Sequence, residues 1–226
     1  MLNQRPAKTS RTPRKTDAAR KAVRDPAQTR KKILQFATLE FSEKGFDGAR
    51  VDRIAKRCRV SKNMLYYYYS SKEDLFLAVL ENAYSRLRDR QAAWTVYSDD
   101  PVESMRDLIR HTFAALLEEP QMIRLLNEEN LYKARHIRRS KLIRELYNPL
   151  FEKLQRILQQ GVDKGIFRSD LDPKILYMSL SSLAYHYVSN QYTLEFALQI
   201  PLTSEEYRQR WLRNITEMIV GHLSRT

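Results

Sequence analysis

The sequence contains little cysteine and little glycine. Its 226 residues include one cysteine, Cys58, which excludes an internal disulfide and a zinc site built from several cysteines. It has only five glycines, and this scarcity of turn-forming residues favours an all-helical chain with short connections. No run approaches the roughly 18 apolar residues of a membrane span, and no hydrophobic N-terminal segment indicates secretion. We therefore expect an all-α protein without a membrane partner, located in a bacterial-type cytoplasm or, as the alternative, in a nucleus.

Catalytic patterns are also missing. The four histidines, at positions 111, 136, 186 and 222, lie far apart, and none has a metal-ligand neighbour at helical spacing. The sequence has neither a Gly-rich phosphate loop nor a nucleophile elbow. Cys58 falls on the apolar side of a short predicted helix. This position favours a buried packing role for the thiol over a role as a nucleophile or a redox sensor. The sequence therefore predicts no enzyme, no cofactor and no metal site.

Positive charge is concentrated in the first third of the chain. Of the formal net charge of +13, residues 1–25 contribute eight Lys or Arg against two acidic side chains, and residues 26–72 contribute eleven against four. The remaining 154 residues carry 21 basic and 21 acidic side chains. A concentrated basic surface is the usual means of attracting phosphate groups. The pattern predicts a polyanion-binding module at the N-terminus of a neutral body.

The first 25 residues show no apolar periodicity and are predicted to form a disordered basic arm. Two interpretations of this arm stay open. It is either a solubilising tail or a segment that lies along the DNA backbone or in a minor groove.

The next segment has the pattern of a helix-turn-helix unit. Asp25-Pro26 is a helix cap followed by proline in the first turn, and Gly45 supplies a stop. A short amphipathic helix follows at residues 51–58. After a turn at Arg59-Val60, Ser61 can cap a third helix. In such a unit the second short helix enters the major groove of DNA.

The same segment resembles a known family. Its spaced elements are Gly45-Phe46, Val51 with Ile54-Ala55, Val60-Ser61-Lys62, Leu65-Tyr66-Tyr67, and Ser71-Lys72-Glu73 with Leu75-Phe76. Together they resemble the N-terminal domain of the TetR family of transcriptional regulators. The resemblance implies an all-α homodimer of about nine helices per subunit. It implies a helix-turn-helix DNA-binding domain over residues 26–72 and a larger helical effector-binding and dimerisation domain over residues 73–226.

The residues expected to contact DNA lie on and around the predicted third helix. They are Arg50, Ser61, Lys62, Asn63, Met64, Tyr66, Tyr67, Tyr68 and Lys72. The amide of Asn63 can satisfy the donor and the acceptor of an adenine edge. By resemblance, Tyr66 and Tyr67 match positions that grip the phosphate backbone, and Lys72 matches a phosphate contact.

Four consecutive tyrosines, Tyr66 to Tyr69, point around more than half of the helix circumference. They cannot all belong to the core, although core packing is the alternative for each of them. We expect Tyr69 to pack inward, and the pattern leaves Tyr68 undecided.

Two residues depart from the family pattern. Arg50 stands where Ser or Thr is common, and it cannot cap the second helix by accepting a hydrogen bond. Arg59 stands where glycine is common, so it must tolerate an unfavourable backbone conformation. Both changes add positive charge beside the DNA.

Beyond residue 75 the chain is predicted to form further helices. Their expected ranges are 71–97, 102–118, 121–132, 138–161, 174–194 and 204–223. Pro149 should kink or split the fourth of these. By resemblance, the last two pair with their copies in a dimer interface. The alternative is that their apolar stripes are internal core.

Polar and aromatic side chains on otherwise apolar segments are candidates for a ligand pocket. They are Trp94, Asn127, Asn130, Tyr147, Tyr177, Tyr185, His186 and Asn190. Each has a structural or surface role as its alternative, and His186 is the preferred single candidate. The basic run at residues 133–141 is interpreted as a solvated face, with contact to an anionic ligand as its alternative.

Together with the resemblance, these patterns predict a ligand-responsive transcriptional regulator, with repression favoured and activation as its alternative. It would bind a roughly palindromic double-stranded DNA operator as a homodimer, and a small-molecule effector would release it. The alternative is a non-specific architectural DNA-binding protein. The large neutral body favours the regulator, because packaging DNA does not require it.

Overall fold

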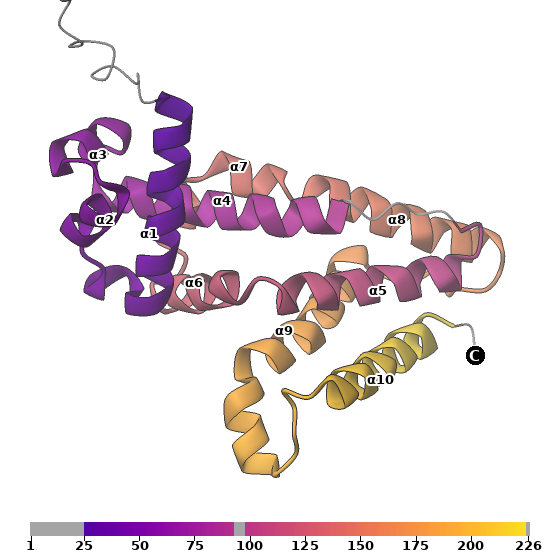
Figure 1. The fold of residues 1–226 in the computed structure, drawn as a ribbon. Coiled ribbons are helices and arrows are strands. Elements are labelled where there is room, and N and C mark those ends of the chain that lie inside the picture. The colour runs from indigo at the N-terminus through magenta and orange to yellow at the C-terminus, as the bar shows by residue number, and fades with distance from the viewer. Residues whose placement is uncertain (1–24, 93–97, 225–226) are drawn as a thin grey trace, which may run out of the picture.

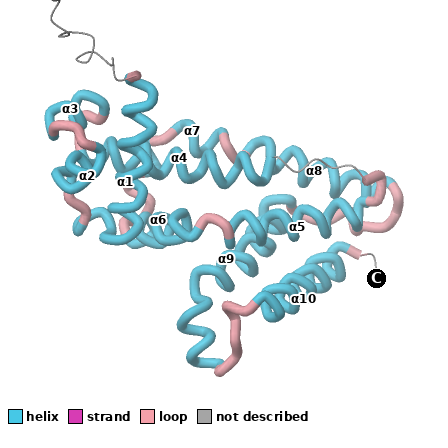
Figure 2. The backbone as a smooth tube through the Cα atoms, in the orientation of Figure 1, coloured by secondary structure: helices cyan, strands magenta, loops and turns pink. Residues whose placement is uncertain are grey.

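A computed structural model describes residues 25–92 and 98–224, which form an elongated all-α molecule (Figures 1 and 2). The α-helices of these residues are α1 Pro26–Gly48, α2 Val51–Cys58, α3 Lys62–Tyr68, α4 Lys72–Ala92, α5 Pro101–Leu117, α6 Pro120–Leu131, α7 Lys141–Glu145, α8 Asn148–Asp163, α9 Pro173–Leu198 and α10 Glu205–Leu223. A 3-10 turn, η1, spans Ile137–Arg139. The predicted all-α fold is confirmed.

Helices α1, α2 and α3 form one end of the molecule (Figure 1). Asp25 caps α1 as predicted, because its Oδ1 accepts a hydrogen bond from the Ala27 N–H at 2.9 Å. Gly45 breaks α1 near its end with φ 67° and ψ 178°, a conformation that favours glycine. The chain then makes a last turn to Gly48 before α2 begins.

Helix α4 joins this end to the rest of the molecule. Its first turn is capped by Ser71, whose Oγ accepts from the Asp74 N–H at 3.0 Å. The rings of Phe41, Phe46 and Phe76 contact one another with centroids 4.9 to 6.2 Å apart. Since Phe76 belongs to α4, the hydrophobic core is continuous across the predicted domain boundary.

Helices α4 to α10 form a bundle in which α5 is central. Helix α5 packs against α4, α8, α9 and α10. The predicted break at Pro149 is present, because α7 ends at Glu145 and α8 begins at Asn148. Asp172 caps α9 through a bond from the Lys174 N–H at 2.7 Å. The second half of α9 projects from the bundle before α10 returns (Figure 1).

Several predictions fall on residues outside the described part of the chain. The basic arm is one, because residues 1–24 are not described. The helix predicted to reach Tyr97 is described to Ala92, and Trp94 lies in the gap at residues 93–97. Within the described ranges, no helix is long and apolar enough to cross a membrane.

Candidate nucleic-acid interface and ligand cavity

Helices α2 and α3 are held by a tight turn. Arg59 adopts the left-handed conformation, with φ 58° and ψ 40°, as its place at a glycine position predicts. The Val60 N–H donates to the Ala55 carbonyl at 3.1 Å. Ser61 then caps α3, its Oγ accepting from the Met64 N–H at 3.1 Å. Leu65, which is fully buried, fixes which face of α3 is turned inward.

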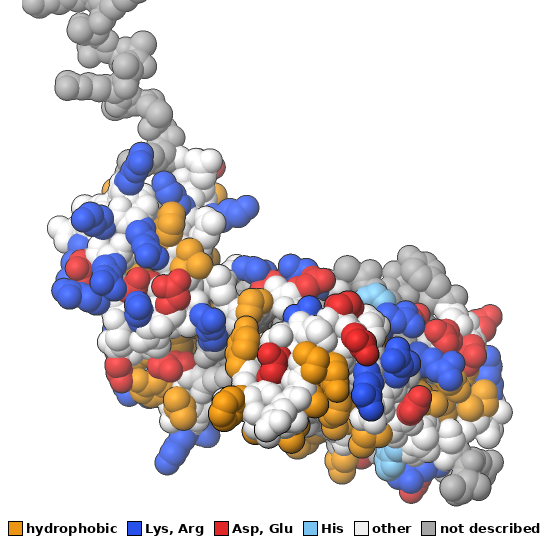
Figure 3. Space-filling view, turned by 60° about the horizontal axis from the view of Figure 1, so that its bottom comes forward, with side chains coloured by type: hydrophobic (Ala, Val, Ile, Leu, Met, Phe, Trp, Pro, Cys, Tyr) orange, Lys and Arg blue, Asp and Glu red, His pale blue; other side chains and the backbone are white. Residues whose placement is uncertain are grey.

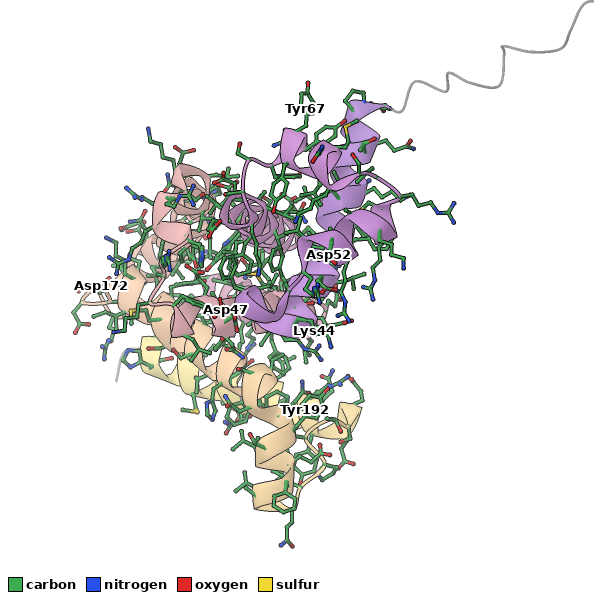
Figure 4. The ribbon with its side chains drawn as sticks, turned by 90° about the vertical axis from the view of Figure 1, so that its left-hand side faces the viewer. Lys44, Asp47, Asp52, Tyr67, Asp172 and Tyr192 are labelled. Carbon is green, nitrogen blue, oxygen red and sulfur yellow. The ribbon has the colours of Figure 1, made fainter. Side chains whose placement is uncertain are left out.

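The outer face of α3 is exposed and polar. Lys62, Asn63 and Met64 are exposed in its first turn. Tyr67 is 82% exposed and projects from α3 away from the rest of the molecule (Figure 4). A short helix with basic, amide and phenol groups on its free face has the donors needed for phosphates and base edges.

The four tyrosines point in different directions. Tyr66 and Tyr68 are half-buried against the core, and the Lys62 Nζ lies 5.9 Å from the centroid of the Tyr66 ring. Tyr69 is only 4% exposed, so its side chain packs inward. Burial raises the pKa of the Tyr69 hydroxyl, although the nearby Arg30 lowers it. The tyrosine run therefore serves both the core and the surface.

Two predicted DNA contacts have partners within the protein. Arg50 makes no capping bond, and its Nε lies 3.4 Å from the Asp52 carboxylate. The Lys72 Nζ donates to the Asp47 carbonyl at 3.3 Å and lies 4.9 Å from the centroid of the Phe46 ring. Lys72 thus fastens the end of α1 in this structure, and its ammonium group has further donors that could contact a phosphate.

Basic side chains gather on the end of the molecule formed by α1, α2 and α3 (Figure 3). This end contains Arg30, Lys31, Lys32, Lys44, Arg50, Arg53, Lys56, Arg57, Arg59 and Lys62. The end of the molecule that carries the exposed face of α3 is therefore also rich in side chains that can attract phosphate.

A cavity of about 210 Å³ lies within the bundle, bordered by α4, α5, α6, α9 and the start of α8. Four predicted candidates line it, namely Asn130, Tyr147, Tyr177 and Tyr185. Asn127 is next to it and accepts a hydrogen bond from the Tyr185 hydroxyl.

Other candidates are not at the cavity. The preferred one, His186, is exposed, and its Nδ1 lies 3.3 Å from the Nδ2 of Asn190. Neither residue lines the cavity. Both therefore remain surface residues in this structure, because the inward positions of this turn of α9 are taken by Ala184, Tyr187 and Val188.

Sequence reasoning missed the polar residues that the cavity buries most deeply. Arg88, Gln91 and Thr112 are each at most 6% exposed, and all three line the cavity. The sequence spacing does indicate that Arg88 faces inward, because it follows Tyr84, which is buried, by one helical turn. An arginine on the apolar stripe of a helix marks either a buried pair or a binding site.

Helix α6 links the cavity to the end of the molecule formed by α1, α2 and α3. Its residue Asn130 lines the cavity, while its Glu128 accepts from the Phe46 N–H through Oε1 at 2.8 Å. The Tyr132 hydroxyl, just after α6, donates to the Asp47 carboxylate. The two bonds fasten α6 to the last turn of α1.

The basic run after α6 is not wholly a solvated face. His136 is 1% exposed, and its Nδ1 lies 2.8 Å from Glu129 Oε2. Its ring packs between Phe46 and Phe76, with centroids 4.7 and 4.9 Å away. The prediction of a solvated face is therefore wrong for His136.

A helix-turn-helix unit with an exposed second helix at a basic end of the molecule, mounted on a helical bundle with a cavity, defines a DNA-binding transcriptional regulator. Residues 33–79 match the family model described as bacterial regulatory proteins, tetR family. Residues 101–219 match the model described as the tetracyclin repressor-like C-terminal domain. The chain belongs to the TetR family.

Relatives and solved structures agree with this assignment. The HTH-type transcriptional repressor NicS of Pseudomonas putida is 32% identical over 88% of this chain and 93% of its own length. The solved structure of SCO4942 from Streptomyces coelicolor has a TM-score of 0.65 at 25% identity, covering 84% of this chain and 97% of that one. The regulator FadR of Bacillus subtilis, solved with stearoyl-CoA, has a TM-score of 0.60 at 18% identity over 85% and 98% of the two chains. The last likeness concerns the fold alone.

Proposed function

We propose that this protein is a ligand-responsive repressor that binds a roughly palindromic operator as a homodimer and leaves it when an effector binds. The observation that carries the proposal is the capped helix α3, whose free face presents Lys62, Asn63, Met64 and Tyr67. Asn63 would contact a base edge, while Lys62 and Tyr67 would contact phosphates. Occupation of a promoter would then block transcription.

The proposed dimer uses α9 and α10. Helix α9 exposes large apolar side chains at Ile175, Met178, Tyr192 and Phe196, the last of them 87% exposed, and α10 exposes Met218. Hydrophobic side chains are visible on the face that these helices form (Figure 3). Large apolar surfaces of this kind mark interaction sites. A second copy would cover them and place two α3 helices about one helical turn of DNA apart, or a multiple of that distance.

The proposed effector site is the cavity of about 210 Å³. An occupant would touch α4 and α6, and α6 is bonded to the end of α1 through Glu128 and Tyr132. A shift of α6 would therefore turn α3 relative to its copy. An effector that binds more tightly to the conformation with the turned α3 would lower the population of the conformation that binds DNA.

We assign residues 26–72 to DNA binding and residues 73–226 to effector binding and dimerisation. Such a regulator would act in the cytoplasm, where operator DNA lies. A non-specific architectural DNA-binding protein would need no cavity between its helices, so the cavity favours the regulator.

The test begins with sequencing of the genomic DNA fragments that the purified protein retains. The proposal predicts enrichment of an inverted repeat, binding of one dimer per repeat, and release by a compound in an effector screen. Retention of all fragments alike, with no repeat enriched, would support the architectural alternative instead.

A further inference from the structure

The cavity contains one charged residue, and the described residues supply no opposite charge for it. Arg88 is 6% exposed and is the only charged side chain among the described residues that line the cavity. No described carboxylate lies within ion-pairing distance of its guanidinium. Taking a charge out of water without an opposite charge costs several kcal/mol, so this arginine requires an explanation.

The other deeply buried charged side chains of the described residues all have charged or strongly donating partners. Glu119 is bonded to Arg86 and Arg90 at 2.8 and 2.9 Å. Glu129 accepts from the backbone N–H groups of His136 and Ile137 at 2.7 and 3.0 Å. The fold thus pairs its buried charges elsewhere, and Arg88 is the exception.

The contacts of Arg88 are all with neutral groups. Its Nη2 donates to the Tyr177 hydroxyl at 3.2 Å, its Nη1 donates to Gln91, and its Cζ lies 4.0 Å from the centroid of the Tyr147 ring. These contacts stabilise the guanidinium, but none of them supplies the negative charge that would pair with it. Burial raises the pKa of the hydroxyls of Tyr84 and Tyr177, so neither supplies a tyrosinate.

Two buried donors are unused. Arg88 Nε and Thr112 Oγ1 have no hydrogen-bond partner among the described residues, and both residues line the cavity. Nε–H and the second Nη2 proton of an arginine form a side-on fork that matches the two oxygens of a carboxylate. The buried arginine therefore has the free donors that a bound carboxylate would use.

The size and lining of the cavity narrow the occupant further. A cavity of about 150 Å³ holds benzene, so about 210 Å³ has room for one ring with a carboxylate. It lies below the roughly 300 Å³ at which pockets for drug-sized ligands begin. Leu87, Leu116, Met122 and Leu126 offer an apolar wall, and the Tyr147 ring offers a face.

We propose that the effector is a small aromatic monocarboxylate, whose carboxylate pairs with Arg88 and whose ring lies among the tyrosines and leucines of the cavity. That the bound molecule acts as an effector rests on the proposed function. Its binding to the cavity can be measured without DNA. One unpaired cation accounts for a single negative charge on the ligand.

The test is calorimetric titration of the full chain, without DNA, with benzoate and 4-hydroxybenzoate. The matching amides, benzamide and 4-hydroxybenzamide, keep the ring and lose the charge. We expect both acids to bind and each amide to bind about 10- to 100-fold more weakly, as loss of a charged hydrogen bond implies. Acetate, which lacks a ring, should bind more weakly than either acid.

Variants of Arg88 test whether benzoate binds at this residue. Arg88→Gln should weaken benzoate binding about 10- to 100-fold, whereas Arg88→Lys should recover part of it, because the charge remains and the fork is lost. The matched control is Arg124→Gln, an exposed arginine of α6, which should bind benzoate like the original chain. The thermal unfolding curve of each variant establishes that it is folded.

Equal binding of acids and amides to the unaltered chain would overturn the inference, as would failure of both acids to bind. Either result would leave the proposed function intact if the chain still selects an inverted repeat and some other compound releases it. Failure to select any repeat, with benzoate bound through Arg88, would instead contradict the proposed function alone.

Discussion

Replacing Glu128 by alanine removes one of the two side-chain bonds that fasten α6 to the end of α1. Glu128 Oε1 accepts from the Phe46 N–H at 2.8 Å, and Phe46 is 8% exposed. Loss of the acceptor leaves this N–H without a partner in a part-buried place, which costs about 1 to 3 kcal/mol. We expect the free energy of unfolding to fall by about 2 kcal/mol and the melting temperature to fall by about 4 to 8 °C.

Two further variants separate the hydrogen bond from general effects of mutation. Glu128→Gln keeps a carbonyl acceptor and should cost about half as much, because only the charge is lost. Glu103→Ala removes a partly exposed glutamate of α5 that pairs with Arg106 and Arg110. Its effect should lie between 0 and about 1 kcal/mol.

The assay is thermal and urea unfolding followed by circular dichroism, combined with hydrogen exchange at the Phe46 amide. Exchange at this amide should accelerate in Glu128→Ala, while amides in the middle of α5 should change no more than the global stability requires. A melting temperature and a Phe46 exchange rate equal to those of the original chain would refute the reasoning.

Three other predictions concern the DNA-binding end. Tyr67→Phe should weaken binding to operator and to random DNA alike, by about 3- to 10-fold in filter-binding assays; a change in base preference at unchanged affinity would contradict the phosphate role. Arg59→Gly should raise the free energy of unfolding by about 1 kcal/mol, because the left-handed conformation at φ 58° costs an L-residue that much; a lower melting temperature would contradict this. Deleting residues 1–24 should flatten the salt dependence of DNA binding if the basic arm meets phosphates, and an unchanged slope would identify it as a bystander.

Local sequence signals predicted the DNA-binding end well. Caps at Asp25, Ser61 and Ser71 depend on residues two or three positions away, and all three are present in the structure. The left-handed conformation of Arg59 was expected because Arg59 stands where glycine is common in the family. Tyr69 packs inward because it lies one turn after the buried Leu65.

The cavity was harder to predict because its walls come from four helices that are distant in sequence and from Tyr147, just before α8. His186 was preferred for its aromatic neighbours, but consecutive helical residues point about 100° apart. Tyr187 occupies the buried direction, its hydroxyl bonded to the Leu202 carbonyl, so His186 faces solvent. The buried face of α4, including Arg88, becomes visible only once α5, α8 and α9 are placed against it.

The burial of His136 also required the tertiary structure. Lys133 and Ala134 both adopt positive φ, at 52° and 62°, and turn the chain back toward α1. This reversal brings His136 to Glu129, seven residues earlier, and beneath Phe46. Nothing in the composition of the basic run indicates a left-handed pair at these positions.

The central claim is that α3 reads the sequence of an operator, and selection from a randomised DNA library tests it most directly. The original chain should enrich an inverted repeat, and Asn63→Ala should change the preferred base at symmetric positions of that repeat, with a cost of about 1 to 3 kcal/mol for the original site. Asn214→Ala, which alters an exposed asparagine of α10, should keep the original preference. Enrichment of no repeat by the original chain, or an identical repeat from Asn63→Ala, would contradict the account.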